Sequence, residues 1–271
     1  MQPLGKLREE IKDEETLHGL ASAFTEVSAA KIGVLKQKFE RNRGFYQEIS
    51  DLYRLVKSSS NPEATASKGM LSVAMTTNNR FYGVINLEVM KKFLNDTKTQ
   101  QTDRLIVGKI GALHLQSVDF KPAFKTMVFE TDVPKMSDLE QLLELAQPYQ
   151  KVLLFYPQFE TIYTQTPAVT DIAYSPTGQK TDGEESLYFI FEPELPKIVD
   201  FFETQIRAIL LQRVLLEMDL SVTASRLQAM SRAQEHAREV LSQRKRQLTK
   251  ETHSRINARL LESLGRVKKW N

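Results

Sequence analysis

The feature that most constrains the fold is a run of 68 residues, Lys197 to Leu264, that contains neither glycine nor proline. These are the residues that most readily end a helix. One continuous helix of this length would extend about 100 Å, whereas the mean globular helix has about 11–12 residues. Such a helix is too long to lie inside one compact domain, so we expect it to project and to pack against a partner.

Apolar residues in this run recur mostly at spacings of three and four, the pattern of a coiled-coil seam. The apolar stripe is wide over residues 206–218 and then narrows, and between Leu241 and Ile256 only Leu248 is apolar. A seam this weak on a long helix indicates that a second helix or a surrounding protein wall helps to hold it.

Positive charge is concentrated in the same part of the chain. The whole chain carries a formal net charge of +3, but residues 205–271 contain 14 Lys and Arg against 6 Asp and Glu. One interpretation is a solvated helix face, with cations near the helix C-terminus where the dipole favours them. The others are docking in an acidic socket and binding of nucleic acid. Because this stretch has only Trp270 for base stacking, no nucleic-acid partner is expected.

The start of the chain predicts a second long helix, over residues 7–57, because its apolar residues recur near helical spacing. Gly19, Gly33 and Gly44 interrupt this pattern, and each costs about 1 kcal/mol relative to alanine in a helix interior. We interpret them as sites of close helix–helix approach or bending, with Gly44 as a candidate break. The two terminal helices are expected to pair as an antiparallel coiled coil with the middle of the chain inserted at one end.

The middle of the chain follows a polar linker, residues 58–68, and alternates between strand and helix patterns. The strands are expected at 71–77, 105–110 (ending in a turn at Gly111), 151–159, 161–174 and 186–192, and the last two flank a hairpin at 175–185. The segment 123–130 is either a further strand or an extended lead-in. Helices are expected at 86–97 and 137–149, the second with Ser137 as N-cap and Glu140 completing a capping box.

This alternation predicts a small, Rossmann-like, mostly parallel sheet inserted between the coiled-coil helices, so the fold class is α/β. The expected domains are an N-terminal coiled-coil helix (1–57), an α/β foot domain (69–192) and a C-terminal coiled-coil helix (197–271).

The motifs of common catalytic and cofactor sites are missing. The chain has no cysteine, no Walker-type phosphate loop, no HExxH and no GxSxG. The segment 108–111 is too short for a dinucleotide fingerprint and is interpreted as a tight turn. The histidines lie without metal-ligand spacing, at His18, His114, His236 and His253. We expect no catalytic residue, cofactor or metal, and, with no apolar run of about 20 residues, no transmembrane segment.

Several short motifs occur in a fixed order: AFTEVSAAK at 23–31, VGKIG at 107–111, LLFYPQFETIYTQTPAV at 153–169, FEP at 191–193, LQRVLLE at 211–217 and ASRLQAM at 224–230. Together with the layout of long helix, small α/β domain and longer helix, they resemble the γ subunit of F-type ATP synthases over essentially the whole chain. The chain is similar to a divergent member of that family.

Two segments depart from the family pattern. The family's glycine-rich SDRGLCGGLN reads TNNRFYGVIN at 77–86, with Gly83 as its one glycine. The family's ARQAxITxEL reads ETHSRINARL at 251–260, so that Thr252 and His253 replace an Arg-Gln pair that helps to latch the rotor to a catalytic β subunit. The cysteine-bearing regulatory insert of chloroplast forms is absent.

The resemblance implies a central rotor shaft without catalytic residues of its own. Its coiled coil would lie inside a hexamer of α and β subunits, and its α/β domain would lie on the membrane c-ring beside an ε-like subunit. Ion flow through the ring would turn the shaft and change the conformation of each β subunit in turn. It also implies a peripheral location on the cytoplasmic face of a bacterial inner membrane.

The resemblance further implies two groups of partner-contact residues. The residues expected to face the hexamer socket are Phe24, Val27, Lys31, Thr252, His253 and Ile256, and those expected in the foot are Tyr82 and Gly83. The competing interpretation is that Phe24, Val27 and Ile256 only form the seam of the coil.

Two other functions remain open on the sequence. One is a free-standing coiled-coil scaffold or adaptor that has kept the fold and lost the rotary partners, which the altered residues at 252–253 and in the foot motivate. The other is a coil that binds nucleic acid through its basic tail.

Overall fold

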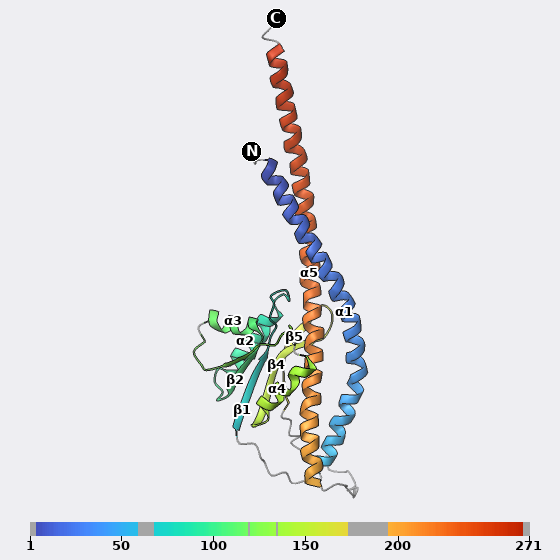
Figure 1. Cartoon of the computed structure of the whole chain (residues 1–271), viewed down its shortest axis with the longest axis vertical. Coiled ribbons are helices and arrows are strands. Elements are labelled where there is room, and N and C mark those ends of the chain that lie inside the picture. The colour runs from blue at the N-terminus through green and yellow to red at the C-terminus, as the bar shows by residue number, and fades with distance from the viewer. Residues whose placement is uncertain (1–3, 59–67, 119, 134, 173–194, 268–271) are drawn as a thin grey trace. The chain divides into compact units, whose positions relative to one another are not determined.

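The computed structural model describes residues 4–58, 68–118, 120–133, 135–172 and 195–267. Its elements, in chain order, are α1 (Leu4–Ser58), β1 (Lys68–Met75), α2 (Ile85–Thr97), β2 (Asp103–Val107), α3 (Lys109–Ser117), β3 (Lys125–Met127), α4 (Met136–Ala146), β4 (Tyr149–Phe159), β5 (Gln165–Asp171) and α5 (Leu195–Val267) (Figure 1). They form two compact units, Met1–Ala29 with Arg226–Asn271, and Ala30–Ser225.

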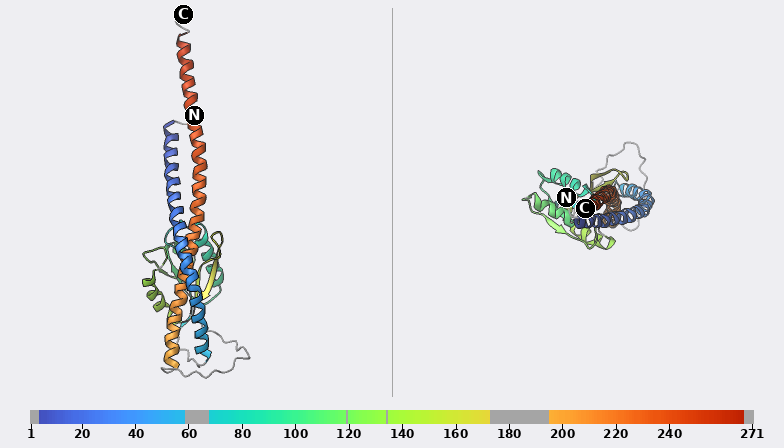
Figure 2. Two further views of the ribbon diagram at one scale, coloured as in Figure 1. Left: turned by 90° about the vertical axis from the view of Figure 1, so that its right-hand side faces the viewer. Right: turned by 90° about the horizontal axis from the view of Figure 1, so that it is seen from above.

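The first unit joins the start of α1 to the end of α5, which lie side by side and run in opposite directions (Figures 1 and 2). Glu10 pairs with Arg244 at 3.4 Å, and the Gln234 side-chain amide donates to Ser22 Oγ at 3.3 Å, so sequence number rises along α1 as it falls along α5. Glu15 also pairs with Lys245, at 2.7 Å. The side chains buried in this unit are Leu7, Ile11, Ala21, Ser28 and Ala237. The expected antiparallel pairing of the chain's two ends is therefore present.

Helix α1 continues without interruption through Gly19, Gly33 and Gly44, so the expected break is wrong. A Cβ atom added at any of these glycines would meet nothing within 4 Å. Close helix–helix approach is therefore not their role either. Packing of the apolar face of a long helix outweighs the modest local cost of each glycine.

The second unit is built on a five-stranded sheet with the order β3-β2-β1-β4-β5. The first four strands are parallel, and β5 runs antiparallel to β4. In register, Val73 of β1 lies beside Leu105 on one side and Leu154 on the other. This is the mostly parallel sheet that the alternation of strands and helices predicts.

Alternating residues of the strands face two separate apolar layers. Val73, Leu105 and Leu154 lie in the layer beneath α4 and the first part of α5. Ala74, Ile106 and Phe155 lie in the opposite layer, beneath α2 and α3. Helix α5 contributes Leu211, Val214, Leu215, Met218 and Val222 to its layer. The second unit therefore has three layers, with the sheet between two layers of helices.

The expected turn at Gly111 is wrong, because Gly111 lies inside α3. The backbone turns instead at Gly108, which has a φ of +93°. A Cβ on Gly108 would lie 2.2 Å from the Thr76 carbonyl oxygen, and one on Gly111 would lie 2.7 Å from the Ile106 side chain. The two glycines let α3 begin directly against the sheet.

The expected cap of α4 is also wrong. The helix begins at Met136, and Ser137 lies within it. The N-cap is Lys135, whose backbone N–H donates to the carboxylate of Asp138 at 2.8 Å. A carboxylate three residues into the helix thus closes this end in place of the expected Ser137–Glu140 pair.

The expected strand at 161–174 begins only at Gln165. The preceding residues form a turn in which Thr161 Oγ1 accepts the backbone N–H groups of Tyr163 and Thr164. The expected hairpin at 175–185 and strand at 186–192 lie outside the described residues. No helix in the described ranges has an apolar stretch long enough to cross a bilayer.

Candidate partner-contact surfaces

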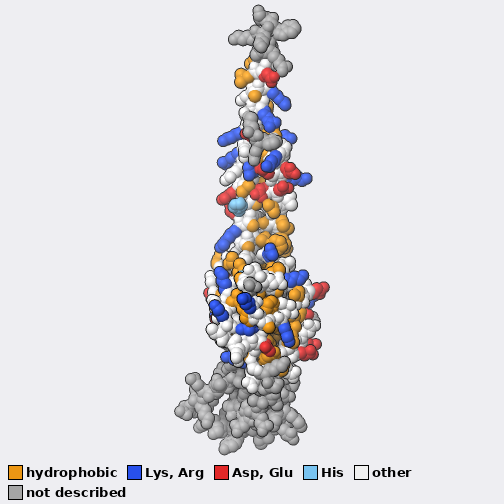
Figure 3. Space-filling view, turned by 90° about the vertical axis from the view of Figure 1, so that its left-hand side faces the viewer, with side chains coloured by type: hydrophobic (Ala, Val, Ile, Leu, Met, Phe, Trp, Pro, Cys, Tyr) orange, Lys and Arg blue, Asp and Glu red, His pale blue; other side chains and the backbone are white. Residues whose placement is uncertain are grey.

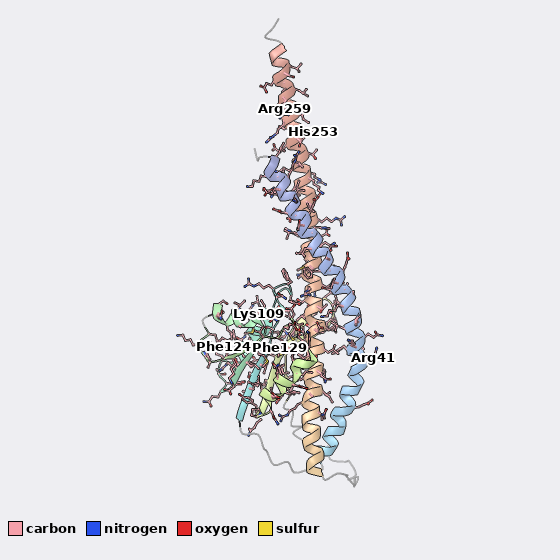
Figure 4. The ribbon with its side chains drawn as sticks, in the orientation of Figure 1. Arg41, Lys109, Phe124, Phe129, His253 and Arg259 are labelled. Atoms are coloured by element: carbon pink, nitrogen blue, oxygen red, sulfur yellow. The ribbon has the colours of Figure 1, made fainter. Side chains whose placement is uncertain are left out.

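The last described turns of α5 extend past the first described turn of α1 within the first unit (Figure 1). Every side chain from His253 to Leu264 is exposed. His253 and Arg259 project from this segment (Figure 4). Basic side chains line it, and acidic side chains gather where α1 pairs with α5 (Figure 3). This segment, 253–264, is the terminal segment.

An apolar stripe follows one side of the terminal segment. Ile256, Leu260 and Leu264 recur every four residues and are 48, 56 and 65% exposed, with Leu261 beside them. Four-residue spacing places side chains on one helix face. An apolar stripe on an otherwise polar helix marks a contact surface. Ile256 therefore belongs to this exposed stripe and not to the seam between α1 and α5.

The two residues that replace the family's Arg-Gln pair have different surroundings. His253 is exposed and lines a shallow hollow on α5 together with Lys250 and Asn257. Thr252 is half-buried, and its hydroxyl donates to the carbonyl of Leu248 one turn earlier, at 2.7 Å. The Thr252 hydroxyl is thus used within its own helix, whereas His253 faces outward.

Phe24 and Val27 differ in burial and in contacts. Phe24 is half-buried, and the Arg226 guanidinium lies over its ring, 5.5 Å from the centroid. This cation–π contact between the two helices fits the seam interpretation of Phe24. Val27 is 62% exposed and faces outward, as do Leu17 and Leu20. These three form an outer apolar stripe on α1, of which the sequence prediction named only Val27 as a contact residue.

Lys31 lies in the second unit and already has an internal partner. Its ammonium group contacts the Asp219 carboxylate of α5 at 2.6 Å, and about half of the Lys31 side chain is exposed. The pair joins α1 to α5 within this unit. A partner could reach the rest of the side chain, but the charge is already paired.

The expected foot residues belong to the loop after β1. Tyr82 is 4% exposed, and its hydroxyl donates to Asp132 at 2.7 Å. Its side chain therefore supports the loop and does not face outward. Gly83 is exposed, with a φ of +59°, and the exposed apolar side chains beside it are Phe81 and Val84. No pattern in the sequence distinguished Phe81 from Tyr82, since both are aromatic and adjacent.

Asp132 organises this loop. Its carboxylate accepts the backbone N–H groups of Asn78 and Asn79, the Asn79 side-chain amide and the Tyr82 hydroxyl. The Asn78 side chain in turn donates to the carbonyls of Phe129 and Thr131. Side-chain hydrogen bonds thus hold a loop in which the resembling family has glycines. The sequence prediction missed Asp132, which lies far along the chain.

The N-terminal end of α3 resembles a phosphate-binding helix end only in position. The N–H of Lys109 donates to Asn78 Oδ1, that of Ile110 to the Thr77 carbonyl and that of Gly111 to Thr76 Oγ1, at 3.0–3.2 Å. A phosphate site needs such N–H groups to be directed at the ligand. These three donors are satisfied inside the chain.

The described residues thus form an antiparallel pair of terminal helices, an inserted, mostly parallel sheet and exposed apolar stripes on both helices. No cluster of His, Asp or Glu suited to a metal occurs within the part of the chain that the structure describes. A family model described as ATP synthase matches residues 4–265, and the chain belongs to that family.

Relatives with similar sequences are γ chains, as the sequence resemblance predicts. An ATP synthase gamma chain of Christiangramia forsetii is 26% identical over the full length of both chains. One from Dictyoglomus thermophilum is also 26% identical and covers 97% of this chain and 96% of its own. The predicted resemblance to a divergent γ subunit is confirmed.

Solved structures confirm the predicted fold class. A chain of the Euglena gracilis mitochondrial ATP synthase, from an OSCP/F1/c-ring structure, superposes with a TM-score of 0.73 at 17% identity, covering 98% of this chain and 93% of its own. A chain of the Tetrahymena thermophila mitochondrial ATP synthase, from a central stalk/c-ring structure, superposes with a TM-score of 0.59 at 19% identity, covering 79% of this chain and 99% of its own.

Proposed function

We propose that this chain is the central rotor shaft of an F-type rotary ATP synthase, a γ-type subunit that couples ion-driven ring rotation to conformational change in the catalytic β subunits. The observation that carries the proposal is the terminal segment, whose apolar stripe α1 does not cover. Membership of the ATP synthase family and the similarity to γ chains support it.

The shaft is a non-catalytic subunit that acts by differential contact. A rotor can change a β subunit only if its contact free energy differs between the conformations of that subunit. The two helices supply an asymmetric surface, with the outer stripe of Leu17, Leu20 and Val27 on α1 and the stripe of the terminal segment on α5.

The proposed partners follow from these surfaces. The terminal segment would lie in a socket formed by the α and β subunits, where its basic residues would meet acidic groups. The exposed residues Phe81, Gly83 and Val84 would face the foot partners, the c-ring and an ε-like subunit. The chain would then be peripheral, on the cytoplasmic face of a bacterial inner membrane, with 1–57 and 197–271 as shaft and 69–192 as foot.

Co-purification with α and β subunits tests the proposal. Ile256→Asp with Leu260→Asp should abolish co-purification, because a carboxylate buried in an apolar socket costs several kcal/mol. The matched control is Ser242→Asp with Thr249→Asp, which adds the same charge to exposed polar positions on the same helix outside the terminal segment. Equal co-purification of both variants would refute the proposed surface. A wild-type chain that stays alone would instead favour the free-standing scaffold.

A further inference from the structure

The face of α5 that packs on the sheet in the second unit is mostly apolar but carries three buried polar side chains. Glu217, Ser221 and Ser225 are 2, 0 and 8% exposed. They recur every four residues and so form one row along the helix. We call this row the polar ladder.

Each member of the polar ladder bonds to the sheet or to a loop at its edge. The Tyr156 hydroxyl donates to the Glu217 carboxylate at 3.3 Å. Ser221 Oγ donates to the carbonyl of Gln158 at 3.3 Å, and Ser225 Oγ donates to the carbonyl of Tyr82 at 2.7 Å. The ladder therefore spans from β4 to the loop after β1 that Asp132 holds.

The apolar contacts on this face cannot define one position by themselves. Leu211, Val214, Leu215, Met218 and Val222 pack on the sheet through non-directional contacts. A slide of α5 by one turn, about 5.4 Å, would bring similar residues over the sheet. Such a slide would bring Ser221 to Tyr156 and Ser225 to Gln158, but the Glu217 carboxylate would lose the Tyr156 hydroxyl. The Tyr82 carbonyl would also lose its donor, because the residue four positions after Ser225 is alanine, and buried polar groups without partners are costly.

Of the three ladder residues, Glu217 has the side chain that is most costly to bury. Burial raises the pKa of its carboxyl, and the charges of Arg213 and the bond from Tyr156 act in the opposite direction. A buried carboxyl that loses its partners is strongly destabilising, whereas an apolar side chain at that position would not be. Its presence therefore favours specificity of position over stability.

We propose that the polar ladder fixes α5 in a single rotational and axial register on the sheet, so that torque applied to the sheet reaches the shaft helix without slip. Transmission of torque by the ladder rests on the proposed rotor function. The fixed register of α5 on the sheet is a property of the isolated chain and can be measured without the complex. Glu217, Ser221 and Ser225 are positioning residues.

Distance measurements between two spin labels test the register in the full-length chain. The chain has no cysteine of its own, so labels attach only at introduced positions. Lys151→Cys on β4 and Gln205→Cys on α5 use exposed sites of the second unit. With the ladder intact we expect one narrow distance distribution. The triple variant Glu217→Leu, Ser221→Ala, Ser225→Ala should add a second population shifted by about 5 Å.

The matched control is Leu211→Ala, which removes a fully buried side chain of the same helix face and leaves the ladder intact. The control should keep the narrow distribution although it is less stable, because all three hydrogen bonds of the ladder remain. The triple variant could lose its helical circular dichroism. The double variant Ser221→Ala, Ser225→Ala then tests the proposal, and we expect the same broadening of its distance distribution.

The assembled complex tests the consequence. Ion pumping per ATP hydrolysed should fall several-fold in the triple variant and stay normal in Leu211→Ala. A narrow distribution in the ladder variants, or equal broadening in the control, would overturn the proposal. If the ladder variants broaden the distance distribution in the isolated chain but the wild-type chain does not assemble with α and β subunits, the rotor function is contradicted and the register proposal is not.

Discussion

Replacement of one glycine by alanine has opposite expected effects at two positions of the second unit. At Gly108 the backbone has a φ of +93°, and the added Cβ would lie 2.2 Å from the Thr76 carbonyl oxygen and 2.6 Å from its carbon. The backbone strain costs about 1–3 kcal/mol, and the forced movement of a packed strand adds about 1–3 kcal/mol. We expect Gly108→Ala to lower the free energy of unfolding by about 2–6 kcal/mol.

Gly33→Ala is the matched control. Gly33 lies in the middle of α1, and its added Cβ meets nothing within 4 Å. The same chemical change should therefore raise the free energy of unfolding, by about 0.5–1 kcal/mol. Urea unfolding followed by circular dichroism measures both. Equal midpoints for the two variants would refute the explanation of α3 as a helix that starts against the β1 backbone.

Three further outcomes are expected in the second unit. Asp132→Ala should lower its stability by about 1–3 kcal/mol, because the partly buried Asn78 N–H and Tyr82 hydroxyl lose their acceptor, and backbone hydrogen exchange at 78–82 should rise. Lys31→Met should cost less than about 1 kcal/mol in urea unfolding, because the pair with Asp219 is partly exposed and screened. Glu217 has a raised folded pKa, so its contribution to stability is full below the ordinary value of 4.5 and is lost as pH rises through the raised pKa. Glu217→Gln should therefore gain stability over the wild type at neutral pH and lose that gain in acid, as unfolding curves at several pH values would reveal.

The long helices and the sheet could be predicted because their signals are local. The absence of glycine and proline over 197–264 predicted α5, and the change from helical to alternating periodicity predicted β1, β2 and β4. One error occurred where a tertiary contact decides: Gly111 lies in a helix because α3 approaches the sheet closely. The other was local, because the start of α4 is closed by the Lys135–Asp138 pair, which has the same three-residue spacing as the expected Ser137–Glu140 pair and lies two residues earlier.

The contact surfaces were harder to predict than the fold. Ile256 was expected to face the socket because of its motif, and its exposure follows from where α1 begins, which no local pattern encodes. Tyr82 was expected in the foot from its position in the loop, but Asp132, 50 residues later, draws its hydroxyl inward. The polar ladder was not predicted either. Polar residues spaced by four on a helix do not indicate a buried row unless their hydrogen-bond partners are known.

Rotation of the chain within an assembled complex tests the central claim most directly. A bead attached through Lys151→Cys, in a chain that has no other cysteine, would report rotation when ATP is added to the complex with α and β subunits fixed to a surface. We expect continuous rotation in one direction, and no rotation with Ile256→Asp and Leu260→Asp. A complex that contains the wild-type chain and hydrolyses ATP while the bead stays still would contradict the account.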